Sequence, residues 1–156
     1  MAMQISNILT QEAVRVIGAA SSKKRLFQEV AEVAQTAYGL KASLTVEALL
    51  DRESLGPTGV GHGVALPHAR LSGIDRVVGV YVSLEKPLDF GAVDRQPVDI
   101  VFALLAPVDA GVEHLKALAL VSRTLREQSF CTKLRANPDT ATLYTILTES
   151  QSVQAA

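Results

Sequence analysis

Two nearly unbroken apolar runs lie in the middle of the chain, at residues 77–84 and 100–106, and both are rich in β-branched side chains. Runs of this kind are typical of strands that are covered on both faces of a sheet. Residues 14–18 have the pattern of a further short strand. We therefore expect a sheet that lies between helices.

Apolar residues at helical spacing predict the helices. One begins after a cap at Ser21 or Ser22 and ends near Gly39, and a second begins at a Thr45 cap and ends around residues 51–53. Further helices are expected at 111–126, 129–135 and 139–148. The prediction is an α/β or α+β fold, a mixed β-sheet flanked by helices, in a single domain over residues 1–150. Residues 151–156 are predicted to be a frayed tail.

Composition excludes several classes of function. The chain has 156 residues, 48% of them hydrophobic and 20% charged, with a formal net charge of −1, which is typical of a globular protein. The chain has no dense Lys/Arg cluster, so nucleic acid is not expected as a partner. No apolar stretch is long enough for membrane insertion. The N-terminus lacks a secretory pattern, and Cys131 is the single cysteine. These features predict a cytoplasmic protein.

Residues 56–70 follow neither hydrophobic period and hold four of the ten glycines. We expect a shaped loop with one or two short strands, whose backbone N–H groups could surround an anion. It matches neither a Walker loop nor a dinucleotide fingerprint. A turn that serves only the fold is the alternative. The candidate binding residues are Thr58, Gly59, Gly61 and Gly63.

Three side chains could carry chemistry. His68 follows Pro67, which fixes the backbone, and a neutral imidazole can attack phosphorus. His114 begins a predicted helix, where free N–H groups favour negative charge. Arg52 could supply a planar, permanently charged guanidinium group to contact a phosphoryl group. The alternatives are a structural His68, a solvated His114, and an exposed Arg52 that pairs with a neighbouring carboxylate; Glu53 could also orient a loop amide or a histidine.

Arg52-Glu53 and the segment 56–68 together resemble the active-site segment of the mannitol/fructose-type enzyme IIA domains of the bacterial phosphotransferase system. The resemblance continues through residues 88–92, 101–107 and 114–119, and so covers nearly the whole chain. A free-standing domain of this size is most similar to the nitrogen-type branch, EIIA-Ntr, and the family fold is a mixed sheet flanked by helices. Three positions depart from the family pattern: Pro57 replaces Ser, His62 replaces Asn and Ala69 replaces Gly.

The resemblance implies a phosphoryl carrier. His68 matches the phosphorylated histidine, His114 the second active-site histidine, and Arg52 the active-site arginine. It implies an HPr-like donor of the nitrogen-related kind (NPr), a downstream regulatory target or IIB-type acceptor, and a mainly regulatory role, with no metal or cofactor. The alternatives are a sugar-specific enzyme IIA that serves a permease IIB domain, a zinc site of His62, His68 and His114, and an interaction module without phosphorylation.

Overall fold

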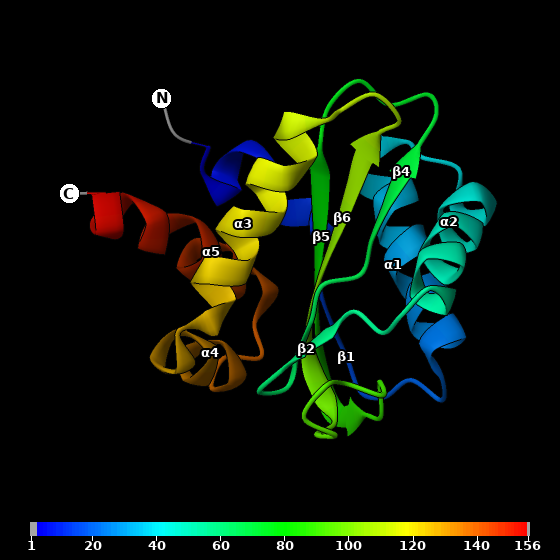
Figure 1. Cartoon of the computed structure of the whole chain (residues 1–156). Coiled ribbons are helices and arrows are strands. Elements are labelled where there is room, and N and C mark those ends of the chain that lie inside the picture. Colours follow the sequence, from blue (N-terminus) through cyan, green and yellow to red (C-terminus); the bar gives the residue numbers. More distant parts are fainter. Residues whose placement is uncertain (1–2, 156) are drawn as a thin grey trace.

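The two central apolar runs form the middle of the sheet in a computed structural model that describes residues 3–155 (Figure 1). Strand β5 (Val78–Leu88) pairs antiparallel with β6 (Val98–Pro107), and β1 (Val14–Ile17) runs parallel to β5 on its other side. Strand β5 continues past the predicted end at residue 84. The predicted mixed sheet is thus confirmed.

The glycine-rich segment supplies three short strands where one or two were expected. They are β2 (Gly59–Gly61), β3 (Val64–Ala65) and β4 (His68–Leu71). Strands β3 and β4 lie one after the other along the same edge of β6 and run parallel to it. The break between them falls at Leu66, whose N–H donates to the Thr58 carbonyl, and at Pro67, which has no N–H to offer the ladder.

Two layers of helices cover the sheet (Figure 1). Helices α1 (Lys23–Tyr38) and α2 (Ala42–Ser54) lie on one face. Helices α3 (Val112–Arg126), α4 (Gln128–Arg135) and α5 (Thr140–Ala155) lie on the other. The predicted ends of α1 are confirmed, because Ser22 accepts a hydrogen bond from the Arg25 N–H and Gly39 has a left-handed φ of 73°.

Other boundaries differ from the predictions. Thr45 is not a cap, because α2 begins earlier: the Ala42 N–H donates to the Gln35 side chain, and the Thr45 hydroxyl donates to the Lys41 carbonyl. Helix α5 continues to Ala155, past residue 148. The frayed tail at 151–156 stays a prediction, and residue 156 lies outside the described residues. Two short 3-10 turns, η1 (Ile5–Asn7) and η2 (Gln11–Ala13), were not predicted.

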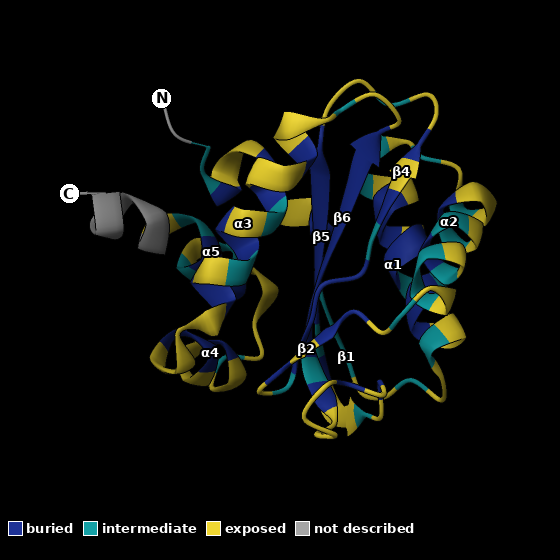
Figure 2. Cartoon of the chain, viewed as in Figure 1, coloured by how far each residue is buried: buried dark blue, intermediate teal, exposed yellow. Residues whose placement is uncertain are grey.

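The core lies on both faces of β5 and β6. Almost every residue of β6 is buried, as Figure 2 shows by colour, and Phe102 and Leu104 are fully enclosed. Burial on two faces explains why these strands read as continuous apolar runs and not as alternating ones. Within residues 3–155, no helix is long and apolar enough to cross a membrane.

Candidate active site

His68 is the first residue of β4, where the register places it opposite Leu104 of the central strand β6. Its ring Nδ1 lies 2.8 Å from the Leu66 carbonyl oxygen. A carbonyl oxygen can only accept a hydrogen bond, so Nδ1 must carry the proton. The neutral ring therefore keeps its lone pair on Nε2, and this nitrogen is the available nucleophile.

His114 comes from α3, in the helical layer on the other face of the sheet from α2, and its ring faces that of His68. It is the third residue of α3, and the two rings meet edge to face with their centroids 5.6 Å apart. His114 is only 5% exposed, and its Nε2 is buried without a hydrogen-bond partner among the described residues. An unpartnered buried nitrogen is costly and uncommon, which makes it a candidate contact for a bound group.

Both imidazoles are held in the neutral form. Burial lowers the pKa of His68, and the nearby Arg52 charge lowers it further. Burial also lowers the pKa of His114, with His68 and Arg70 acting in the same direction. At neutral pH, His68 can therefore attack with a free lone pair, and one nitrogen of His114 can donate a hydrogen bond.

Arg52 lies in the last turn of α2, and its Nη1 donates to the Gly56 carbonyl at 2.9 Å. In the described part of the chain, no ion pair joins Arg52 to Asp51 or Glu53. The alternative of a helix-end arginine paired with one of these carboxylates is therefore wrong. The carbonyl bond uses one N–H of the guanidinium group. Among the described residues the other N–H groups of Arg52 have no hydrogen-bond partner, and the Arg52 charge acts on His68, so these groups could contact an anion there.

Glu53 organises the start of the glycine-rich loop. Its side chain is only 6% exposed, and it accepts hydrogen bonds from the Thr58 N–H at 3.0 Å and the Thr58 hydroxyl at 2.6 Å. Glu53 therefore orients a loop amide, one of the two possibilities, and is not the solvated carboxylate that is commoner in proteins. Lys23 completes this cluster with an ion pair to Glu53 at 2.8 Å and a position 4.8 Å from the centre of the Phe90 ring. No local pattern in the sequence indicates Lys23.

The other candidate loop residues take positions set by the backbone. Gly59 packs against Ala92 so closely that a Cβ atom would lie 2.7 Å from the Ala92 Cβ. Gly61 ends β2 with a φ of 101°, and Gly63 has a φ of 79° in the turn between β2 and β3. The register along β6 separates this turn from His68 by four residues, or roughly 13 Å. The structure therefore does not bring them to the two histidine rings.

His62 stands apart from the other two histidines. It is exposed in the same turn, with its Nδ1 3.3 Å from the Gln128 side-chain nitrogen and its carbonyl bonded to Arg135. Among the residues that the structure describes, no group of three or more His, Cys, Asp or Glu side chains is placed to hold a metal ion. The zinc alternative thus has no cluster to support it.

Curated proteins are similar to this chain in sequence over two thirds or more of its length. A nitrogen regulatory protein of Klebsiella oxytoca is 44% identical over 152 residues, which cover 97% of this chain and 94% of the relative. A nitrogen regulatory protein of Escherichia coli K12 is 41% identical over 150 residues, covering 96% and 92%. A fructose-specific EIIA component of Haloferax volcanii is 32% identical over 104 residues, covering 67% and 68%.

Solved structures agree with this relationship. The crystal structure of IIA-Ntr from Neisseria meningitidis superposes with a TM-score of 0.85 at 33% identity, covering 92% of this chain and 99% of that one. The mannitol IIA of E. coli has the same fold, with a TM-score of 0.72 at 21% identity over 88% and 97% of the two chains. Residues 7–150 match the family model described as phosphoenolpyruvate-dependent sugar phosphotransferase system, EIIA 2. The chain belongs to this EIIA 2 family, a family of phosphoryl-carrying components of the phosphotransferase system.

Proposed function

We propose that this chain accepts a phosphoryl group on Nε2 of His68 from the phosphohistidine of an HPr-like donor, NPr, and acts mainly as a regulator through its phosphorylation state. The observation that carries the proposal is the 2.8 Å hydrogen bond from Nδ1 of His68 to the Leu66 carbonyl. It fixes the tautomer and leaves Nε2 as the attacking atom.

The reaction exchanges one phosphorus–nitrogen bond for another. Nε2 attacks the phosphorus in line, the bond to the donor imidazole breaks, and the donor nitrogen leaves with the electron pair. Because the two nitrogens are chemically alike, positioning and charge stabilisation matter more than a strong base. The Leu66 carbonyl also stabilises the positive charge that His68 gains as its new bond forms.

His114 and Arg52 would stabilise the phosphoryl oxygens during transfer. The buried Nε2 of His114 lacks a partner among the described residues, and a phosphoryl group between the rings would supply one. Arg52 approaches from α2 and adds a permanent positive charge whose effect already reaches His68. Donors fixed in advance of the reaction are the most effective kind, because they need no reorganisation.

The names of the relatives support a regulatory role in preference to sugar transport. The nitrogen regulatory proteins are 41–44% identical over almost the whole chain, whereas the fructose-specific component is 32% identical over two thirds of it. The output would be a downstream target that distinguishes the two forms, or a IIB-type acceptor. We place this exchange in the cytoplasm, because the single cysteine, Cys131, suits a reducing compartment.

The test is phosphorylation by purified components. The protein is incubated with phosphoenolpyruvate, the general phosphotransferase enzyme and an HPr-like donor, and then weighed by mass spectrometry. One phosphoryl group is expected on wild type and on the matched variant His62→Asn, and none on His68→Gln. Nitrogen-15 NMR of the histidine rings should assign the bond to Nε2. Comparable uptake from ATP without the donor, or uptake by His68→Gln, would contradict the proposal.

A further inference from the structure

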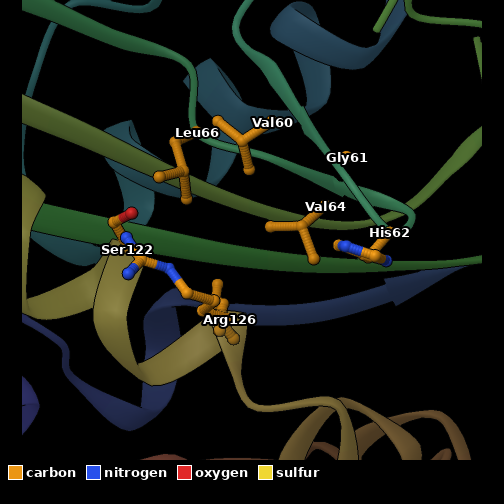
Figure 3. A pocket seen from close by; sticks show the side chains of 8 residues that line it. Val60, Gly61, His62, Val64, Leu66, Ser122 and Arg126 are labelled. Atoms are coloured by element: carbon orange, nitrogen blue, oxygen red, sulfur yellow. The ribbon is translucent and has the colours of Figure 1, made fainter. Parts of the chain in front are cut away.

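A small cavity lies beside the phosphoryl site, between the glycine-rich strands and α3. Its volume is about 150 Å³, and Figure 3 shows Val60, Val64 and Leu66 on the strand side. Leu125 of α3 contributes to the opposite wall. The pocket opens to solvent where Val60, His62 and Arg126 are exposed, and its volume is close to that of a cavity that holds a benzene molecule in another protein. The apolar walls can therefore hold a compact hydrocarbon group.

The polar part of the cavity carries one positive charge. Ser122 and Arg126 lie one turn apart on α3, and Figure 3 shows the Arg126 side chain extending back toward Ser122. Within residues 3–155, no carboxylate forms an ion pair with Arg126. The cavity thus combines apolar walls with the Arg126 guanidinium group, the Ser122 hydroxyl group and, at the strand side, the imidazole of His62.

We propose that this cavity binds a small monocarboxylate whose body is a compact branched or aromatic group. The carboxylate would pair with Arg126 and accept a hydrogen bond from Ser122, because guanidinium groups match carboxylates in geometry and charge. The hydrocarbon body would fill the space against Val64 and Leu66. Inorganic phosphate fits less well, because it would leave those walls uncovered.

Two contacts connect the cavity to the phosphoryl site. The Leu66 side chain lines the cavity, while its carbonyl accepts the hydrogen bond that fixes the His68 tautomer. Ser122 lies two turns after His114 on the same helix. A bound carboxylate therefore touches both segments that hold the histidine pair. This coupling rests on the proposed function, whereas the binding itself does not.

The experiment is an NMR titration of the unphosphorylated full chain with benzoate as the probe. We expect saturable shifts of the backbone amides of Leu66, Ser122 and Leu125. Arg126→Gln should weaken binding by about tenfold or more, because a charged hydrogen-bond partner is lost. Arg123→Gln is the matched control, since Arg123 is exposed on the same helix outside the cavity, and its affinity should equal that of wild type.

Two further probes separate charge from shape. Benzyl alcohol has a similar size without the charge and should bind more weakly than benzoate. Inorganic phosphate carries charge without the apolar body and should also bind more weakly. Equal affinity of wild type and Arg126→Gln for benzoate, or shifts that never saturate, would overturn the binding site.

The coupling is measured on the ring of His68. Benzoate at a concentration near the wild-type Kd should move the His68 ring nitrogen-15 resonances of wild type clearly and those of Arg126→Gln much less at the same concentration. Binding without any change at His68 would overturn the proposed coupling, but the proposed binding site would stand. Because neither readout needs phosphorylation, a failure of the proposed function would be seen separately, in the phosphoryl-transfer assay.

Discussion

Replacing His114 with leucine should separate catalysis from stability. The side chain is 5% exposed, and its Nε2 has no partner among the described residues. His114→Leu removes the proposed donor to the phosphoryl group, and losing one such donor costs about 2–4 kcal/mol in the transition state, or roughly 10²- to 10³-fold in rate. The same change removes a buried, unsatisfied nitrogen, which costs a folded protein about 1–3 kcal/mol. Transfer should therefore become slower while the free energy of unfolding stays the same or rises.

The assay has two parts. A quenched-flow time course with a phosphorylated HPr-like donor gives the transfer rate to wild type, His114→Leu and the control His62→Asn. Urea unfolding of the same three proteins gives their free energies of unfolding. A wild-type rate for His114→Leu would refute the role in stabilising the phosphoryl group. A loss of more than about 2 kcal/mol of stability would show instead that His114 mainly supports the fold.

Three other changes test the site and its surroundings. Gly59→Ala should lower the free energy of unfolding by about 1–3 kcal/mol in urea, because the new Cβ would lie 2.7 Å from the Ala92 Cβ. Adding Ala92→Gly should restore part of the loss, since the Ala92 Cα would still lie 3.1 Å from the new Cβ. Stability should fall as pH drops below about 6.5, because the lowered pKa values of His68 and His114 mean that the unfolded chain binds more protons there; a flat pH profile would contradict this. Arg52→Lys keeps the charge but loses the planar guanidinium group, so the transfer rate should fall by about tenfold or more without a matching loss of stability. A wild-type rate would exclude a specific guanidinium contact.

The sequence predicted the sheet and most helices because buried apolar residues recur at regular spacing along helices and fill buried strands without a break. The apolar runs of β5 and β6 and the Ser22 and Gly39 caps of α1 are local signals, and the structure confirms them. Thr45 was wrongly predicted to be a cap. The side chain of Gln35, seven residues upstream near the end of α1, accepts a hydrogen bond from the first N–H of α2, and the hydrophobic pattern of α2 does not reveal this contact.

The site could be predicted only in part, for a similar reason. The resemblance pointed to His68, His114 and Arg52, but not to the Leu66 carbonyl that accepts a hydrogen bond from Nδ1 of His68. That bond depends on the backbone conformation between β3 and β4. Lys23 was also missed, because only the packing of α1 against α2 brings it to Glu53.

The two faces of the sheet contribute separately to the same site. Arg52 belongs to α2 on one face, His114 belongs to α3 on the other, and His68 lies between them on β4. A phosphoryl group on His68 that contacted both Arg52 and His114 would link the two helical layers reversibly. Phosphorylation would then slow the opening of the layers as well as add charge, and a target could recognise the protein by how firmly α2 and α3 are held together.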